Sequence, residues 1–194
     1  MIEPQRPSVS PHPDFSRIAI IGISGAGKTT LARQIASRTG SKHIELDALY
    51  WATEWQPKPP EEARALIRSA VAHERWVSDG NFSAFRDLVW RRATLIVWLD
   101  VSLHVALWQV LVRSLRRIAS RTSLWDGNRE TLLRTFFSRH SIVLWTLREH
   151  GAKRRTHEQL MNRGEWASLP WLVLRNRSDV SGLLAALDRH ARKS

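Results

Sequence analysis

The sequence contains no cysteine, only one tyrosine, and no long uninterrupted hydrophobic run. Without cysteine, a disulfide framework and a cysteine-ligated metal site are both excluded. The longest apolar-leaning segment is residues 101–112, and it is much shorter than the ~20 residues that a transmembrane helix needs. These absences predict a soluble protein without a membrane span. The lack of cysteine is also compatible with the reducing cytoplasm, where we expect the protein to reside.

Prolines are concentrated at the start of the chain, where Pro4, Pro7, Pro11 and Pro13 fall within residues 1–16. This composition predicts a flexible tail and does not resemble a signal peptide. The remaining residues, 17–194, have the length of one domain. With 43% hydrophobic residues, the chain can bury a single core.

Acidic residues are scarce relative to basic ones, and the net charge is +12. Residues 1–100 carry +2 and residues 101–194 carry +10. A basic half attracts polyanions such as nucleic acid, anionic lipid or nucleotide phosphates. An arginine-rich surface that only maintains solubility explains the same numbers equally well. Because the sequence has no recognised nucleic-acid-binding motif, nucleic acid remains the less favoured partner.

Apolar runs and helical periodicities alternate along the chain. Short apolar runs predict strands at residues 17–22, 43–46, 75–78, 94–99 and 171–174. Helical patterns cover residues 27–39, 60–70, 102–118, 129–150 and 183–190. This alternation predicts an α/β fold with a parallel sheet covered by helices on both faces.

The most specific motif is the Gly-x-x-x-x-Gly-Lys-Thr pattern of a P-loop, at residues 22–29. It follows a predicted strand and opens a predicted helix, so backbone N–H groups and the helix N-terminus can hold phosphate. Lys28 is expected to reach the β- and γ-phosphates of ATP, and Thr29 is expected to bind Mg²⁺. The predicted nucleotide-binding residues are Gly22, Ile23, Ser24, Gly25, Ala26, Gly27, Lys28, Thr29 and Thr30.

Three aspartates, Asp47, Asp79 and Asp100, lie at the predicted carboxyl ends of strands. Ligands of open parallel sheets bind outside these ends. We therefore expect Asp79 to hold Mg²⁺ together with Thr29, and Asp47 to contact or deprotonate the acceptor hydroxyl. The alternative is that each aspartate is a turn or helix-cap residue, and for Asp100 we favour that role.

Arginines cluster between the two long predicted helices, in a segment of about residues 113–139 that we expect to form a lid. Phosphoryl transfer needs positive charge around the transferred group, and Arg117, Arg121 and Arg129 lie nearest the predicted turn. Arg113 and Arg139 are expected to be solvent-facing.

The acceptor side is predicted from residues that follow the aspartates. Asn81 and Arg86 come after Asp79, and Arg86 is placed to meet an acceptor phosphate or carboxylate. Tyr50 and Trp51 follow Asp47 and are candidates for stacking on a flat acceptor. A small aromatic cluster under the loop is the alternative for these two, and it is at least as well supported.

The segments at residues 22–30, 43–51, 76–82 and 96–100 together resemble a bacterial group of adenylate-kinase-related P-loop proteins, whose members are often labelled adenylate kinase or DNA topology modulation protein. The resemblance implies the nucleoside-monophosphate-kinase-like P-loop NTPase fold: three layers, a five-stranded parallel sheet of order 2-3-1-4-5, and an arginine-bearing helical lid. It also implies that Asp79 lies near Mg²⁺ and that the acceptor binds around Asp47 and Arg86. Here Asp79-Gly80 continues with Asn81-Phe82-Ser83, and not with the Phe-Pro-Arg of adenylate kinases.

Two hypotheses follow from these patterns. The first is a kinase that moves the γ-phosphoryl group of ATP to a small-molecule acceptor, which the sequence leaves open as a nucleotide, a nucleoside or another hydroxyl compound. The alternative is a nucleotide-binding regulatory protein or a DNA- or RNA-associated ATPase that uses its basic second half.

Overall fold

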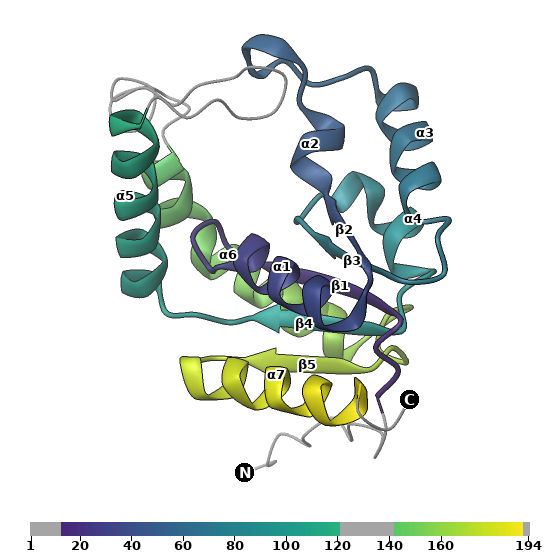
Figure 1. The fold of residues 1–194 in the computed structure, drawn as a ribbon. Coiled ribbons are helices and arrows are strands. Elements are labelled where there is room, and N and C mark those ends of the chain that lie inside the picture. The colour runs from purple at the N-terminus through teal and green to yellow at the C-terminus, as the bar shows by residue number, and fades with distance from the viewer. Residues whose placement is uncertain (1–12, 121–141, 192–194) are drawn as a thin grey trace.

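A computed structural model of the chain describes residues 13–120 and 142–191, in which strands and helices alternate (Figure 1). The strands are β1 (Arg17–Gly22), β2 (Lys42–Glu45), β3 (Trp76–Asp79), β4 (Leu95–Leu99) and β5 (Trp171–Leu174). The α-helices are α1 (Lys28–Thr39), α2 (Leu46–Tyr50), α3 (Pro60–Ala70), α4 (Arg86–Trp90), α5 (Leu103–Ala119), α6 (Ile142–Asn162) and α7 (Arg177–Ala191). Two 3₁₀ turns, η1 (Thr53–Trp55) and η2 (Ser83–Phe85), precede α3 and α4.

The strands form one parallel sheet of order β2-β3-β1-β4-β5, with β1 at its centre. Ile18 of β1 is in register with Val77 of β3 on one side and with Leu95 of β4 on the other. A central strand of this kind is covered on both faces, which explains why its sequence is continuously apolar and does not alternate. The predicted α/β fold and strand order are therefore confirmed.

Alternate residues of β1 point into two separate hydrophobic clusters, because successive strand residues face opposite sides of a sheet. Ile18 and Ile20 pack into a cluster that includes residues of α1 and α7, whereas Ala19 and Ile21 pack into one that includes residues of α3 and α4. Figure 1 shows α1 and α7 in front of the sheet and α6 behind it. The result is a three-layer arrangement, and the carboxyl ends of the strands are left to carry loops.

The two long helices differ in how well the sequence predicted them. The periodicity at residues 102–118 corresponds to α5, but the pattern at residues 129–150 gave the wrong end for the next helix. Helix α6 continues to Asn162, and residues 129–141 lie outside the described part of the chain. No helix among the described residues is both long and apolar enough to cross a bilayer.

Two five-residue helices that flank the candidate site were not predicted from the sequence. Helix α2 begins directly after β2 and carries Asp47 in its first turn, and α4 begins at Arg86. Five residues are too few for a helical periodicity to be recognised. Tyr50, which was predicted to lie in a loop, therefore belongs to α2, and Arg86 is the first residue of α4.

Candidate active site

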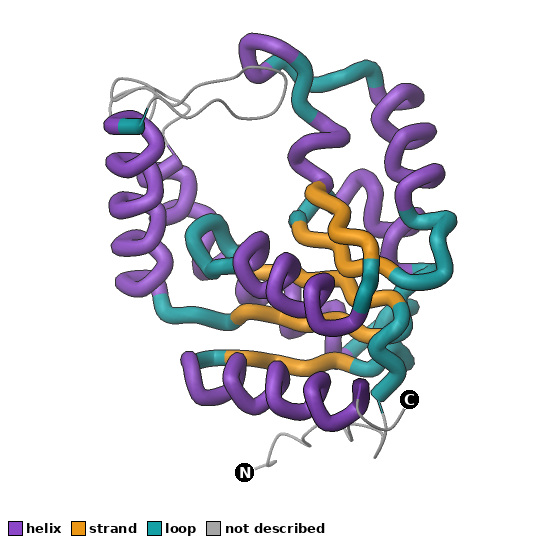
Figure 2. Tube along the Cα trace, in the orientation of Figure 1, coloured by secondary structure: helices purple, strands orange, loops and turns teal. Residues whose placement is uncertain are grey.

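The P-loop motif forms the connection between β1 and α1, which Figure 2 shows as a loop at the carboxyl end of the central strand. Gly25 has a φ of 79°, and a Cβ atom added to it would lie 2.3 Å from the carbonyl oxygen of Ala106 on α5. Only glycine fits this position, because L-residues rarely adopt that φ and the neighbouring atom is backbone. The loop is therefore packed tightly against α5.

Lys28, the first residue of α1, bends back over the loop. Its ammonium donates hydrogen bonds to the carbonyl oxygens of Gly22 (2.9 Å) and Ile23 (3.0 Å). Burial lowers the pKa of Lys28, and the carboxylates of Asp47 and Asp79 counteract part of that effect. The ammonium thus lies between the phosphate loop and both predicted carboxylates.

Thr29 and Asp79 are in direct contact, as their predicted shared role requires. The Thr29 hydroxyl donates to Oδ2 of Asp79, whose side chain is 5% exposed. Oxygen donors of this type suit Mg²⁺, which takes one or two protein ligands and completes its octahedron with water and substrate phosphates. Among the described residues, no three acidic, histidine or cysteine side chains are arranged so that they could hold a metal ion together, and a magnesium site of this kind does not need three. Thr29 and Asp79 are therefore a chemically suitable pair for the ion.

His43 is a neighbour of Asp79 that the sequence analysis did not identify. Its Nε2 lies 3.0 Å from Oδ1 of Asp79, while its Nδ1 lies 3.8 Å from Glu45, which pairs with Arg33. Asp79 thus uses one oxygen for His43 and the other for Thr29. The contact joins β2 to β3 diagonally, because His43 is in register with Val77, and pairing between strands so far apart in the chain cannot be predicted from local sequence.

Asp47 lies in the same charged group. Burial raises the pKa of its carboxyl group, and the negative charge of Asp79 raises it further. The positive charge of Lys28 and a hydrogen bond from the Trp51 indole (3.3 Å) act in the opposite direction. A carboxylate with a raised pKa beside a lysine is suited to accept a proton from an acceptor hydroxyl.

Arg113 was expected to face solvent, and this expectation is wrong. Its charge acts on both Lys28 and Asp47, and the residue is partly buried. The spacing explains its position: Ala106, Val110 and Arg113 lie on one face of α5, and the first two contact the Gly25 region. This helical spacing was visible in the sequence, but the packing of α5 on the loop was not.

Asn81 was predicted to contact the substrate. In the structure its side chain bonds to the backbone of the phosphate loop. Its Oδ1 accepts a hydrogen bond from the Gly22 N–H (3.1 Å), and its Nδ2 donates to the Gly22 carbonyl oxygen (2.5 Å). Gly80 N–H already donates to the carbonyl oxygen of Ile20, so the Asn81 side chain extends the β1–β3 ladder by one step. It ties the end of β3 to the beginning of the phosphate loop.

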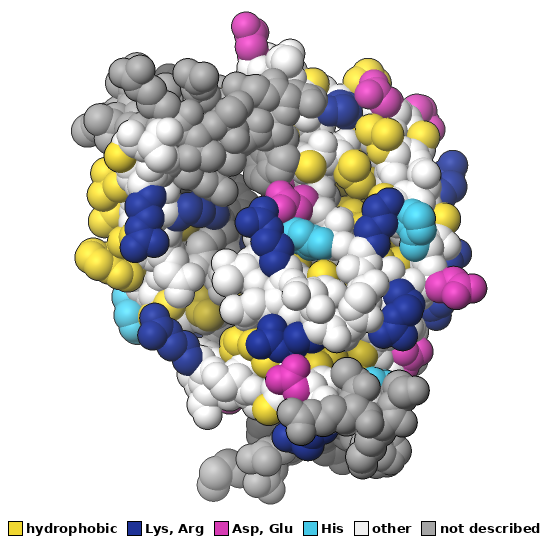
Figure 3. Space-filling model, in the orientation of Figure 1, with side chains coloured by type: hydrophobic (Ala, Val, Ile, Leu, Met, Phe, Trp, Pro, Cys, Tyr) yellow, Lys and Arg dark blue, Asp and Glu magenta, His cyan; other side chains and the backbone are white. Residues whose placement is uncertain are grey.

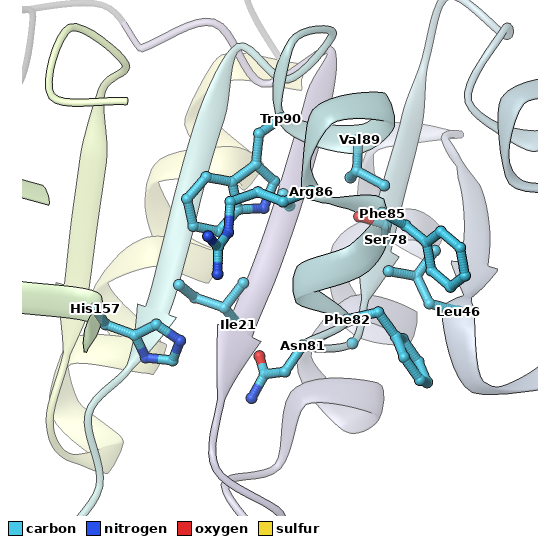
Figure 4. A pocket seen from close by; sticks show the side chains of 12 residues that line it. Ile21, Leu46, Ser78, Asn81, Phe82, Phe85, Arg86, Val89, Trp90 and His157 are labelled. Carbon is cyan, nitrogen blue, oxygen red and sulfur yellow. The ribbon is translucent and has the colours of Figure 1, made fainter. Parts of the chain in front are cut away.

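A pocket with about 350 Å³ of space, partly open to solvent, lies beside these residues at the ends of β1 and β3. Its lining residues are Ala19, Ile21, Leu46, Ser78, Gly80, Asn81, Phe82, Phe85, Arg86, Val89, Trp90 and His157. Figure 4 shows Arg86 and His157 reaching into it from different sides. Arg86 therefore lines a pocket, while its contact with an acceptor stays a prediction, and His157 is a lining residue that was not predicted from the sequence.

The aromatic residues after Asp47 pack on one another. The ring centroid of Tyr50 lies 4.7 Å from that of Trp51 and 4.6 Å from that of Phe82, and Trp51 lies 6.0 Å from Trp55. This is the satellite cluster that was the alternative to stacking on a substrate. Both Tyr50 and Trp51 remain partly exposed, so one face of the cluster is accessible.

Two other groups of predicted residues lie apart from this site or cannot be placed. Asp100 accepts from Arg154 and Arg175, both at 3.3 Å, so it joins the end of β4 to the middle of α6 and to the end of β5. Arg117 belongs to α5, but its side chain is outside the described part of the structure. Arg121 and Arg129 lie outside the described residues altogether. The predicted lid thus remains a prediction.

No family model matches the sequence. The chain is 24% identical over 166 residues to an uncharacterized protein, YqaC, of Bacillus subtilis (strain 168), an alignment that covers 84% of this chain and 89% of that protein. It is 23% identical over 190 residues to a cytidylate kinase of Rhodopirellula baltica (strain DSM 10527 / NCIMB 13988 / SH1), covering 89% of this chain and 79% of the kinase.

Among solved structures, a shikimate kinase from Acinetobacter baumannii in complex with shikimate superposes with a TM-score of 0.56 at 13% identity. The superposition covers 93% of this chain and 95% of the shikimate kinase. The fold is that of the P-loop kinases. At this level of identity the likeness extends to the fold alone, and it leaves the acceptor unassigned.

Proposed function

We propose that this chain is a P-loop kinase that transfers the γ-phosphoryl group of ATP to a hydroxyl group of a small-molecule acceptor. The observation that carries the proposal is the convergence of Lys28, the Thr29–Asp79 pair and Asp47 at the carboxyl end of the sheet. They come from the carboxyl ends of three strands: Lys28 and Thr29 follow β1, Asp47 follows β2 and Asp79 ends β3, as expected for a ligand site of an open parallel sheet. The kinase fold and the cytidylate kinase relative support the same activity class.

Different residues of the site bind the phosphates, hold the metal ion and neutralise the charge of the transferred group. Backbone N–H groups of residues 23–29 hold the phosphates, and Lys28 neutralises charge at the transferred group. Thr29 and Asp79 would hold Mg²⁺, which when bound neutralises the β- and γ-phosphate oxygens. The positive charge of Arg113 adds to this field, and Arg117, Arg121 and Arg129 are proposed to contribute further charge from the lid.

Asp47 acts at the acceptor. The acceptor oxygen attacks the γ-phosphorus, the bond from that phosphorus to the β–γ bridging oxygen breaks, and the hydroxyl proton passes to the Asp47 carboxylate. The acceptor itself occupies the pocket lined by Asn81 and Arg86, and Tyr50 packs against Phe82 of its lining. Membership of the adenylate-kinase-related group is part of this proposal, and a cytoplasmic location is expected for it.

The test is a panel of candidate acceptors incubated with ATP labelled in the γ-phosphate and with Mg²⁺. Lys28→Ala should abolish transfer to any acceptor that the native protein phosphorylates, while Lys42→Ala, which removes an exposed lysine of β2, should retain it. Asp47→Asn should lose transfer but keep ATP binding. Full transfer by Lys28→Ala would overturn the proposal.

The alternative, a DNA- or RNA-associated ATPase, is supported by the charge of +10 on residues 101–194. Basic side chains of the described residues are scattered over the face seen in Figure 3, interspersed with acidic ones, and they do not form one continuous patch there. Counterion release would make duplex binding fall by orders of magnitude between about 50 and 200 mM salt. If the protein binds no duplex at low salt, this alternative is excluded.

A further inference from the structure

Arg86 is a cation that lacks a partner in the described structure. It opens α4, its guanidinium carbon lies 4.9 Å from the centre of the Trp90 ring, and burial alone lowers its pKa. No carboxylate pairs with it within residues 13–120 and 142–191. A guanidinium stays charged, and a partly buried charge without a counter-ion is costly. An anion from solution would remove that cost.

His157 reaches the same pocket from α6. The residue is 5% exposed, and its ring makes an edge contact with Trp98 at a centroid distance of 5.4 Å. In the part of the chain that the structure describes, no hydrogen bond to its imidazole is formed. A buried polar side chain that is aimed into a pocket and lacks a partner points to a ligand as its partner.

The electrostatic surroundings of His157 are positive. Burial, and then the positive charges of Arg86, Lys153 and Lys28 in that order, together lower its pKa to about 4. These residues face it from α4, from α6 itself and from α1, and no acidic group acts against them. The imidazole is therefore neutral near pH 7 and lies in a field that favours an added negative charge.

We propose that Arg86 and His157 form a subsite for an anionic group, a carboxylate or a phosphate, of the acceptor. This rests on the proposed function, because the pocket is the acceptor pocket only if the P-loop holds ATP. The subsite lies close to the P-loop, because Asn81 lines the pocket and is hydrogen-bonded to Gly22, the first residue of that loop. The kinase would thus select an acceptor that has both a hydroxyl group and an acidic group.

Binding at this subsite is coupled to a proton. The anion brings a negative charge to a neutral imidazole, so it raises the pKa of His157, and the imidazole takes one proton from solvent to form a charged hydrogen bond. Because the bound state holds the extra proton, affinity rises as pH falls. Between the pKa of His157 in the free protein and its higher pKa in the complex, affinity decreases about tenfold per pH unit, and above the pKa in the complex it becomes constant.

The test uses two simple anions whose charge is constant between pH 5.5 and about 8.5: sulfate for a tetrahedral group and acetate for a planar one. The protein is first saturated with Mg²⁺ and a non-hydrolysable ATP analogue, so that the P-loop itself cannot bind the probe. Histidine side-chain NMR then follows His157, identified by its loss in His157→Phe. This variant retains an aromatic ring against Trp98.

We expect one of the two anions to convert the His157 signal from neutral to protonated, with affinity that falls as pH rises. Arg86→Gln should weaken binding about tenfold or more. His157→Phe should bind more weakly and lose the pH dependence. The matched controls are Arg91→Gln, which removes another arginine over a tryptophan, and His104→Gln on exposed α5 surface, and both should bind as the native protein does.

The proposal is overturned if neither anion changes the His157 signal, or if Arg86→Gln binds as well as Arg91→Gln. Thermal unfolding of each variant shows whether lost binding is lost folding, and Arg86→Lys provides a second, charge-retaining variant. Failure of the subsite is distinct from failure of the kinase assignment. If the ATP analogue binds and an uncharged acceptor is phosphorylated, the function holds and the subsite does not. If the analogue does not bind, the proposed function fails at the P-loop.

Discussion

The double hydrogen bond between Asn81 and Gly22 makes a quantitative prediction about the phosphate loop. Asn81→Ala removes the acceptor for the Gly22 N–H and one of the donors to its carbonyl oxygen. The carbonyl retains Lys28 as a donor, whereas the buried N–H loses its partner. One replaced hydrogen bond costs about 1 kcal/mol and one unsatisfied buried donor about 1–3 kcal/mol. The free energy of unfolding should therefore fall by about 2–4 kcal/mol.

Asn81→Asp is the sharper variant, because it is isosteric and changes only the donor. Its carboxylate would still accept from the Gly22 N–H, but its second oxygen would face the Gly22 carbonyl oxygen. Protonation restores a donor, so the folded-state pKa of the introduced carboxyl group is raised above its unfolded value. Its stabilisation is therefore present at low pH and is lost as pH rises through the folded-state pKa. The gap in stability between this variant and the native protein should narrow on acidification.

Urea unfolding at several pH values measures both effects, and binding of a fluorescent ATP analogue reports on the loop. The control is Asn162→Ala, at an exposed position at the end of α6, which should stay within about 0.5 kcal/mol of the native protein. If Asn81→Ala is no less stable than Asn162→Ala, Asn81 does not anchor the loop, and its role is confined to the acceptor pocket.

Other residues give further predictions. Gly25→Ala would place a methyl group 2.3 Å from the Ala106 carbonyl oxygen, so it should lower both the melting temperature and ATP affinity; an unchanged melting curve would contradict the packing of α5 on the loop. Burial raises the pKa of Asp47 above 3.8, so kcat should rise with pH through that raised pKa as the base form appears; a kcat that does not fall on acidification would contradict Asp47 as the base. Asp100→Ala should cost only about 1 kcal/mol in urea unfolding, because its partner Arg154 is half-exposed, and should retain phosphotransfer; loss of transfer in a folded variant would place Asp100 in the active site.

The fold was largely predictable because its signals are local. Buried parallel strands appear as short apolar runs, and β4 and β5 were found at almost their observed bounds. The end of α6 was missed because Gly151 and the following basic residues interrupt the apolar periodicity that marks a helix. Packing of the helix behind the sheet maintains it through this polar stretch, and such tertiary stabilisation is not encoded in a short window.

The site was predictable only where one motif carries it. Lys28 and Thr29 are assigned by their spacing, and Asp79 by its position after a strand. Arg113 and His157 depend on which faces of α5 and α6 turn toward the sheet. The charged residues of other elements that act on them, Lys28, Asp47 and Arg86, are 66 to 129 residues away in the chain, so no sequence spacing indicates them.

Asp79, the last residue of β3, and the next two residues, Gly80 and Asn81, connect the nucleotide side of the proposed site to its acceptor side. Asp79 contacts Thr29 at the start of α1, and Asn81 holds Gly22 at the start of the loop. Between them, Gly80 has a φ of 144°, and a Cβ atom there would lie 2.8 Å from Cβ of Leu46, the residue before Asp47. The absence of a side chain at Gly80 therefore lets α2 approach β3 closely enough to bring Asp47 next to Lys28. These contacts hold the phosphate loop, the Thr29–Asp79 pair and Asp47 against one short segment. Their relative positions are therefore set before any substrate binds, and catalysis by positioning requires this.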